Sequence, residues 1–511
     1  MLISAKDIFS SVQRSAFGVQ CLEIELPLSK SESNRALMIM HYAESQSHKV
    51  VETQCVMSDS DDTVLLQKHL NTLNKYLQGL LSGDCCPLTL ELDCHNAGTV
   101  FRFLMTAVAN QCIMHNAQFI IDEELGSKQL SNLATQQLSI LLTGSERMKN
   151  RPIDSLVEAL RSLGVVIEYK GREGYPPILV RGGRIEGGRV EVSAEQSSQF
   201  ASSLLLAAPL WKDGLELHLT GNLSSLPYID MTIDMMRQCG IDVVRNERDI
   251  TVKPGRYNIE DIKVEPDWSA AAFWYEMASF SDNAEILLKN LNINSLQADA
   301  AAIKMFESLG IETISVEEGV VVGKTTRQQD NKTTRFVDAE TQSLKDAKFE
   351  VNGQRSASKS AFSVEVNSRS LCQQSVSEST FNFKDCPDLF PAVIAACAGN
   401  KVNATFTGLK NLSIKESDRK HAMMNELSKI GISFEEISDD ELKMFCPEKL
   451  PYFSEENPII FNNYDDHRIA MALSLLSMKI GAVSMENTDV VSKSYPGFFE
   501  DSCTLRLCER K

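Results

Sequence analysis

The segment IDSLVEALRSLGVVIE, residues 153–168, carries the pattern that decides the fold. Its apolar residues fall at positions i, i+3, i+4 and i+7, the spacing of one buried helix face. Gly164 follows where a left-handed helix end is expected, and the β-branched residues after it begin a strand. The segment therefore predicts a helix that turns at a glycine into a strand.

The same pattern occurs three more times. The further copies are YIDMTIDMMRQCGIDVV (228–244), ADAAAIKMFESLGIETI (298–314) and SDRKHAMMNELSKIGISFEE (417–436). SDSDDTVLLQKHLNTL from Ser58 resembles a copy without the glycine, and SYPGFFEDSCTL from Ser494 resembles a shortened one. Repetition of a fixed unit indicates a repeated supersecondary motif of strands and helices. A helix, a glycine and a strand also follow one another in any α/β protein, so on these matches alone both interpretations stay open.

The size and composition of the chain are those of a globular protein. Its 511 residues suggest two to four domains, and its 43% apolar content supplies large buried cores. No stretch of 18 or more apolar residues occurs, and the opening residues lack the order of a signal peptide. We therefore expect a cytoplasmic protein.

The cysteines, histidines and charges exclude several classes of function. Thirteen cysteines form no CxxC pair and eight histidines show no HExxH spacing, so we expect neither a metal site nor a disulfide framework. The formal charge of -18 argues against a nucleic-acid surface, so a local basic cluster must attract any anionic ligand. No glycine-rich phosphate loop follows a predicted strand, which disfavours nucleotide-dependent chemistry.

Six short stretches nevertheless concentrate charged and hydroxyl residues beside small ones. They are SKSESNR (29–35), HNAGTVFR (95–102), LTGSERMKNRP (142–152), SSQF (197–200), KESDR (415–419) and YDDHR (464–468). Their basic members include Lys30, Arg35, Arg102, Arg147, Arg151, Lys415, Arg419 and Arg468. Such residues suit a cleft for a multiply anionic small molecule, because guanidinium forks match carboxylate and phosphate groups. Helix caps and surface ion pairs explain any single motif better, and only the number of motifs favours the cleft.

Two carboxylates are candidates for acid and base chemistry. Asp388, in DCPDLFPAV, follows a proline at the start of an apolar helix, and Glu416 lies between Lys415 and Ser417. A carboxylate that faces a substrate hydroxyl can act as a general base. Without further information, a structural role explains both residues better than a catalytic one.

The order of the motifs resembles one known family. SKSxSNRAL, NAGT, LTGxxRMKxRP, SSQF, PYID, a PD-helix, KESDR, DHR and KxYPxFF are similar to the 5-enolpyruvylshikimate-3-phosphate synthase family of enolpyruvyl transferases, from Leu26 to Phe499. The resemblance implies an α/β fold of two similar globular domains, each of three βαβαββ repeats with helices packed inside sheets, an inside-out α/β barrel. It implies two crossover strands near Ser29 and Glu265. The first domain would then be 30–265, and the second 1–29 and 266–511 with an insertion at 323–380.

The resemblance also implies a reaction. These enzymes transfer the enolpyruvyl group of phosphoenolpyruvate to the 5-hydroxyl of shikimate 3-phosphate and release phosphate, in the shikimate pathway to chorismate and aromatic amino acids. The implied mechanism is addition and elimination through a tetrahedral intermediate. The implied partners are these two small molecules, with no cofactor, no metal, no nucleic acid and no membrane, and the protein would be a monomer in which glyphosate competes with phosphoenolpyruvate.

Site residues follow from the resemblance, motif by motif. The implied catalytic residues are Asp388, the base for the 5-hydroxyl, and Glu416, Lys30 and Lys493, among which the proton donor stays open. The implied contacts of shikimate 3-phosphate are Lys30, Ser31, Arg35, Ser197, Ser198, Gln199, Ser225, Tyr228, Asp388, Asn411 and Lys415. The implied contacts of phosphoenolpyruvate are Lys30, Asn96, Gly98, Arg147, Gln199, Arg419, Arg468 and Lys493.

Two alternatives remain within this resemblance. One is the sister enzyme that transfers enolpyruvate to UDP-N-acetylglucosamine, but that family carries a cysteine in a glycine-rich loop and LTGSERMK has none. The other is a catalytically inactive relative that binds shikimate 3-phosphate, although Lys30, Asp388, Lys415 and Glu416 are all present. Some positions depart from the family pattern, such as Leu226 where a lysine is frequent, but none removes an expected catalytic charge.

Overall fold

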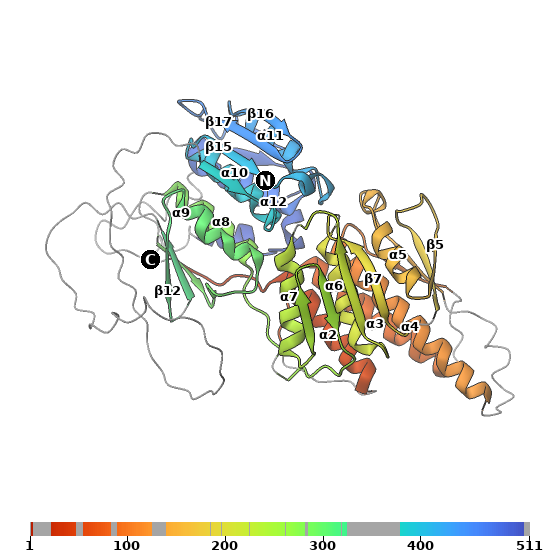
Figure 1. The fold of residues 1–511 in the computed structure, drawn as a ribbon. Coiled ribbons are helices and arrows are strands. Elements are labelled where there is room, and N and C mark those ends of the chain that lie inside the picture. Colours follow the sequence, from red (N-terminus) through yellow and green to blue (C-terminus); the bar gives the residue numbers. More distant parts are fainter. Residues whose placement is uncertain are drawn as a thin grey trace, which may run out of the picture.

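The chain forms two lobes with separate hydrophobic interiors (Figure 1). The structure is a computed structural model. It describes residues 2–3, 22–47, 55–82, 89–124, 139–183, 185–195, 197–223, 225–260, 262–281, 285–317, 319–323 and 379–504. Most of the predicted insertion at 323–380 lies outside the described residues.

The first lobe holds eight described strands and six described α-helices. Its strands are β3 (Thr89–Asp93), β4 (Ser139–Thr143), β5 (Val165–Tyr169), β6 (Ile178–Gly183), β7 (Gly188–Ser193), β8 (Leu215–Thr220), β9 (Val243–Asn246) and β10 (Asp249–Val252). Its helices are α2 (Lys30–Ser47), α3 (Asp61–Ser82), α4 (Gly98–Glu124), α5 (Asp154–Ser162), α6 (Ser198–Ala207) and α7 (Leu226–Gln238), with the 3-10 turns η1 (Met148–Asn150) and η2 (Ala208–Leu210).

The second lobe contains the remaining described elements. Its strands are β1 (Leu2–Ile3), β2 (Leu22–Ile24), β11 (Glu285–Lys289), β12 (Glu312–Val316), β13 (Gly319–Gly323), β14 (Ser379–Asn382), β15 (Ala404–Thr407), β16 (Ser433–Ser438), β17 (Glu441–Phe445), β18 (Ile459–Phe461) and β19 (Val483–Met485). Its helices are α8 (Trp268–Phe280), α9 (Ala302–Glu307), α10 (Phe390–Gly399), α11 (Arg419–Ser428), α12 (His467–Leu475), α13 (Ser477–Ile480) and α14 (Phe498–Thr504). Its 3-10 turns are η3 (Ala298–Ala301), η4 (Pro387–Leu389), η5 (Lys410–Ile414) and η6 (Thr488–Lys493).

One sheet topology recurs in both lobes. Two parallel strands are followed by an antiparallel hairpin in the orders β3-β4-β6-β5, β7-β8-β10-β9, β2-β11-β13-β12 and β14-β15-β17-β16. A three-stranded sheet, β1-β19-β18, repeats the parallel pair. These repeats confirm the predicted α/β fold of repeated units.

The four predicted helix, glycine and strand segments are confirmed. Helices α5, α7, α9 and α11 are each followed by a glycine in the left-handed region and then by β5, β9, β12 and β16. The φ angles are 94° at Gly164, 85° at Gly240, 84° at Gly310 and 87° at Gly431. Only glycine adopts this conformation without strain, so each one reverses the chain onto its sheet.

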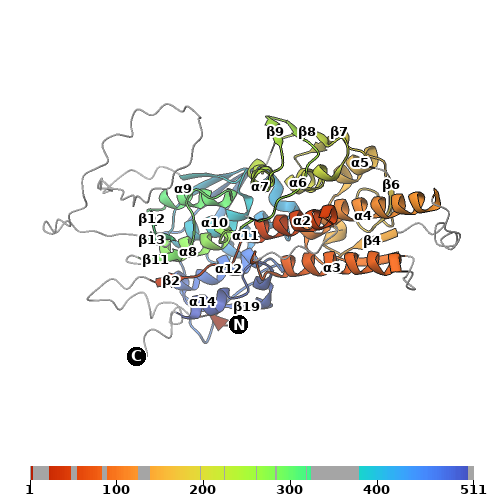
Figure 2. The ribbon, with the colours of Figure 1, turned by 90° about the horizontal axis from the view of Figure 1, so that it is seen from below.

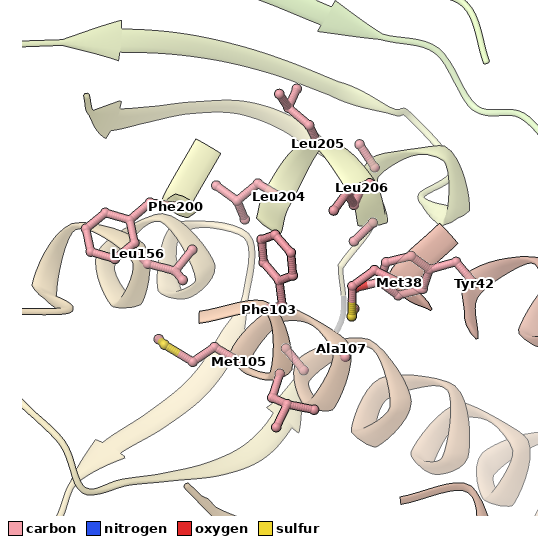
Figure 3. Packing of buried hydrophobic residues seen from close by; sticks show 14 of the residues in the cluster. Met38, Tyr42, Phe103, Met105, Ala107, Leu156, Phe200, Leu204, Leu205 and Leu206 are labelled. Atoms are coloured by element: carbon pink, nitrogen blue, oxygen red, sulfur yellow. The ribbon is translucent and has the colours of Figure 1, made fainter. Parts of the chain in front are cut away.

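Three helices run through the interior of each lobe. They are α2, α4 and α6 in the first and α8, α10 and α12 in the second, and all thirteen residues of α8 are buried. Figure 3 shows Phe103 of α4 among Leu204 of α6 and Met38 of α2. Helix α10, with the sequence FPAVIAACAG, is apolar or small on every face, as expected for a helix that sheets and other helices surround. No helix among the described residues is long and apolar enough to cross a membrane.

Two chain segments connect the lobes side by side. Leu28 pairs with Pro266 in an antiparallel bridge, and the Ser29 N–H donates to the Glu265 carbonyl at 2.8 Å. Strands β1 and β2 both lie in the second lobe. These contacts and the two separate cores support the predicted domains, whose boundaries at 30–265 stay a prediction.

Candidate active site

A cleft between the lobes collects the first turns of helices from both sides. Its walls come from the starts of α2, α4, α6 and α7 in the first lobe and from η4, η5, α11 and α12 in the second. Figure 2 shows α2 and α4 running away from the second lobe, so that their first turns face it. Helix starts carry a partial positive charge, so this arrangement attracts anions. The cleft, with its open mouth, measures about 890 Å³.

The structure brings together fourteen of the predicted site residues in this cleft. They are Lys30, Ser31, Arg35, Ser197, Ser198, Gln199, Ser225, Tyr228, Asp388, Asn411, Lys415, Glu416, Arg419 and Arg468. The four predicted residues outside the lining are Asn96, Gly98, Arg147 and Lys493. Six further residues line the cleft. The sequence singled out Arg102 and Arg151 only as basic residues suited to such a cleft, and it did not single out Asp62, Thr99, Ile414 and His467.

The lining is strongly cationic, although the whole chain is acidic. Seven lysine and arginine side chains face only three carboxylates, those of Asp62, Asp388 and Glu416. Opposite charge attracts an anion most strongly where burial limits screening by solvent. The cleft is therefore the local basic cluster that the net charge of the chain requires of an anion-binding protein.

Asp388 is held by cations on three sides. Its carboxylate lies 2.7 Å from Nη1 of Arg419, 3.1 Å from Nη2 of Arg468 and 3.3 Å from Nζ of Lys415. Burial on its own raises the pKa of this carboxyl, but Arg468, Lys415 and Arg419 together outweigh burial and hold the pKa well below its usual value. Asp388 is therefore a carboxylate at neutral pH.

Arg419 connects Asp388 to a second carboxylate, Glu416. Its Nη2 lies 3.0 Å from Glu416 and its Nε lies 2.8 Å from Asp466, the residue that caps α12. On the other side of Glu416, Nζ of Lys493 lies 3.6 Å away and also donates to the Asn96 carbonyl at 3.2 Å. Burial raises the pKa of Glu416, but Lys493 and Arg419 outweigh it and hold the pKa well below its usual value. Lys493 and Asn96 thus stand directly behind a residue that lines the cleft.

A third ionic contact lies at the start of α2. Nζ of Lys30 is 3.2 Å from Asp62 at the start of α3, and both side chains are largely buried.

His467 also lines the cleft. Burial lowers the pKa of its ring well below the usual value, and the nearby charges of Lys30 and Arg468 lower it further. His467 is therefore neutral, and it contributes a polar wall without a charge.

The guanidinium of Arg35 donates its hydrogen bonds to other residues of the first lobe. Its Nε donates to Thr232 at 2.7 Å, its Nη1 to the Ser31 carbonyl at 2.7 Å and its Nη2 to the Tyr228 carbonyl at 3.0 Å. These bonds tie α2 to α7, next to the cleft. The predicted contact of Arg35 with substrate stays a prediction, and in this structure the side chain positions its neighbours.

Hydroxyl and amide groups complete the first-lobe wall. Ser197 caps α6 by accepting a hydrogen bond from the Gln199 N–H at 3.2 Å. The Gln199 amide bridges two residues of α4, accepting from Nη1 of Arg102 and donating to Thr99, both at 2.7 Å. Ser225 adopts a left-handed φ of 54° and donates its N–H to the Lys384 carbonyl of the second lobe at 3.1 Å. The wall is thus fixed in place before any ligand arrives.

Arg147 contacts the opposite lobe. It donates to the carbonyl oxygens of Glu416 at 3.1 Å, Ser413 at 3.1 Å and Lys415 at 2.9 Å. Its side chain therefore holds the segment 413–416, which carries the lining residues Ile414, Lys415 and Glu416. Arg151, four residues later in the same motif, lines the cleft instead. The 3-10 turn η1 separates the two arginines, and the sequence contained no signal for which of them faces the cleft.

These features define a class of protein: a two-lobed α/β enzyme of repeated units that takes a small polyanionic substrate between its lobes. The chain belongs to the EPSP synthase (3-phosphoshikimate 1-carboxyvinyltransferase) family, whose family model matches residues 20–501. A 3-phosphoshikimate 1-carboxyvinyltransferase of Bacteroides fragilis is 31% identical over 479 residues, covering 94% of this chain and 93% of that protein. The enzyme of the same name from Sulfurovum is 29% identical, covering 94% and 95%. An EPSP synthase structure from Acinetobacter baumannii shares the fold, with a TM-score of 0.61, 19% identity and 96% of each chain covered.

Proposed function

We propose that this chain transfers the enolpyruvyl group of phosphoenolpyruvate to the 5-hydroxyl of shikimate 3-phosphate and releases inorganic phosphate. The observation that supports this function most strongly is the cationic cleft between the lobes. In this cleft, arginine and lysine side chains surround the carboxylates of Asp388 and Glu416. Both substrates are small polyanions, so this cleft suits them in charge. Membership of the family supports the reaction itself.

In the proposed mechanism a proton first reaches the methylene carbon of phosphoenolpyruvate. The neighbouring carbon becomes electrophilic, the 5-hydroxyl adds to it, and Asp388 takes the hydroxyl proton. The tetrahedral adduct then loses phosphate, and a methyl proton returns to the enzyme. Lys30 or Lys493 would supply the first proton, and the Glu416 carboxylate, which lies beside Lys493, would receive the last one.

The cationic lining supports the proposed steps electrostatically. Arg419 and Arg468 would contact the phosphate or carboxylate of phosphoenolpyruvate and stabilise the charge that develops on the departing phosphate. Hydroxyl and amide groups of Ser197, Ser198 and Gln199 would hold shikimate 3-phosphate at the start of α6. Closing the lobes over both substrates would exclude water, which would otherwise hydrolyse the intermediate.

A coupled assay of phosphate release tests the proposal. Phosphate should appear from phosphoenolpyruvate when shikimate 3-phosphate is present and not when it is omitted. UDP-N-acetylglucosamine is the matched control acceptor, because it serves the sister enzyme. Equal release with both acceptors, or release with neither, would reject the proposed function.

The site roles, the monomeric state and the cytoplasmic location belong to the same proposal. Light scattering of the purified chain tests the monomer, and fractionation of the source cells tests the location. The site roles are tested by the substitutions given in the Discussion.

A further inference from the structure

Two buried arginines converge on one point at the start of α4. Arg102 is 4% exposed and Arg151 is 7% exposed, and both line the cleft. Nη1 of each lies 2.5 Å from the position that a Cβ on Gly98 would occupy. Two like charges are therefore neighbours inside the protein, where their repulsion is strong.

The protein leaves part of this pair without a partner. Nε and Nη1 of Arg151 and Nε of Arg102 are buried with no hydrogen-bond partner among the described residues. Burial lowers the pKa of Arg102 well below its usual value, and repulsion from Arg151 lowers it further. Glu416 acts in the opposite direction and raises the pKa of both arginines, but it is already in contact with Arg419 and Lys493.

Four other cations of the cleft contact a carboxylate, although Nε and Nη1 of Arg468 also lack a hydrogen-bond partner among the described residues. Arg419, Arg468 and Lys415 share the Asp388 carboxylate, and Lys30 pairs with Asp62. The arginine pair at α4 lacks an equivalent acid of its own. It also lies at the positive end of a helix of 27 residues, which adds charge of the same sign. Buried unpaired guanidinium groups are costly, so the arrangement requires an anion from outside the chain.

We propose that Arg151, with Arg102, directly binds one oxyanion group of the enolpyruvyl donor, its phosphate or its carboxylate. This inference rests on the proposed function and adds Arg151 to the binding residues. Guanidinium groups bind both kinds of oxyanion in bidentate fashion. Gln199 holds Arg102 in place at 2.7 Å, and the absence of a side chain at Gly98 leaves room for the ends of both arginines.

Arg151→Met tests the proposal, because methionine keeps much of the apolar stem and removes the charge. The Michaelis constant for phosphoenolpyruvate should rise about tenfold or more, the loss of one hydrogen bond to a charged group. The constant for shikimate 3-phosphate should change less than about twofold, and Arg151→Lys should recover part of the loss. Arg189→Met, at an exposed residue of β7, removes the same charge and should leave both constants unchanged. A rise confined to shikimate 3-phosphate, or no rise, would overturn the proposal.

The melting temperature separates binding from a structural role. Removing one of two buried, repelling cations should leave the melting temperature of the ligand-free protein unchanged or higher, whereas loss of a structural arginine would lower it. Inorganic phosphate and pyruvate, added separately, should distinguish a phosphate site from a carboxylate site. The one that raises the melting temperature of the wild type should lose that effect in Arg151→Met. This measurement does not need turnover, so it tests the anion-binding subsite even if the proposed reaction fails. Equal shifts of the melting temperature in the wild type and in Arg151→Met would contradict the subsite.

Discussion

Arg419 holds Asp388 through a 2.7 Å contact, and both residues stand at helix starts within the second lobe. The proposed base and the proposed anion-binding arginine are therefore assembled before the lobes meet a substrate. Arg419 and Arg468 now lower the pKa of Asp388. An anion that binds these two arginines would partly neutralise their charge, so the pKa of Asp388 would rise. Binding of the donor would thus make Asp388 a stronger base at the moment it is needed.

Asp388→Asn should abolish most turnover while preserving substrate binding. The amide keeps the shape of the side chain but accepts no proton, and general-base contributions are typically about a hundredfold to ten-thousandfold. Removing a negative charge beside Arg419 and Arg468 should leave the affinity for phosphoenolpyruvate equal or tighter. Steady-state rates and calorimetric titration measure the two effects. Asp385→Asn, an exposed neighbour, is the control, and wild-type turnover in Asp388→Asn would reject the base role.

Glu32 predicts a pH dependence at the connection between the lobes. Its carboxylate accepts the Glu265 N–H at 2.7 Å, and burial, with repulsion from Glu265 and Asp267, raises its pKa to about 7. The folded state keeps this proton up to about pH 7, while the unfolded chain releases it near the ordinary glutamate pKa of 4.5. Stability should therefore fall between these pH values, by on the order of 3 kcal/mol from this group.

Glu32→Gln should remove that dependence. The amide resembles the protonated acid, so the variant should match the wild type near pH 4.5 and melt at a higher temperature above pH 7. Thermal unfolding between pH 4.5 and 8 measures the difference, with the exposed Glu91→Gln as control. Parallel pH profiles for Glu32→Gln and the wild type would show that the buried carboxyl does not titrate in this way.

Gly98→Ala should impair binding of the donor more than the fold. The new Cβ would displace the ends of Arg102 and Arg151, which are flexible side chains, so the backbone need not move. We expect the Michaelis constant for phosphoenolpyruvate to rise roughly tenfold, about the value of one charged hydrogen bond. Gly171→Ala is the control, because its Cβ would meet Pro177 at an ordinary 3.4 Å. An unchanged constant would mean that the two guanidinium groups do not touch the donor.

Arg147→Met separates two roles for this arginine. The sequence predicts a contact with phosphoenolpyruvate, whereas the structure has Arg147 bound to carbonyl oxygens of the 413–416 loop. If it holds that loop, which carries Lys415 and Glu416, the substitution should raise the Michaelis constants for both substrates and lower the rate. Initial-rate kinetics with each substrate varied in turn decide between the roles. A rise for phosphoenolpyruvate alone would favour the direct contact.

Local patterns predicted the four segments of helix, glycine and strand, whereas the two-lobed architecture followed from the family resemblance. The glycines after α5, α7, α9 and α11 were identifiable because the left-handed turn favours glycine, and the regular spacing of apolar residues marks the helices they end. The copy expected from Ser58 is the helix α3, and the shortened copy from Ser494 contains α14. Pairing between lobes, such as Ser225 with Lys384, depends on how the lobes meet, which no local pattern encodes.

The sequence predicted which residues gather in the cleft better than it predicted the contacts that each of them makes there. The family resemblance named fourteen residues that line the cleft, most of which lie at or next to helix starts. Asp62 was missed because its partner Lys30 is thirty-two positions away in the chain, and an isolated aspartate at a helix start resembles an ordinary cap. Arg147 and Arg151 differ only in their position around a 3-10 turn, so which one reaches the cleft is decided by packing.

Phosphoenolpyruvate labelled with oxygen-18 at the atom between carbon and phosphorus tests the central claim most directly. Enolpyruvyl transfer breaks the bond between carbon and that oxygen, so the phosphate released in the presence of shikimate 3-phosphate should carry the label, as mass spectrometry would show. The organic product should gain the enolpyruvyl group without the label. Unlabelled phosphate, with the label in pyruvate or in the organic product, would mean cleavage between phosphorus and oxygen and would contradict the account.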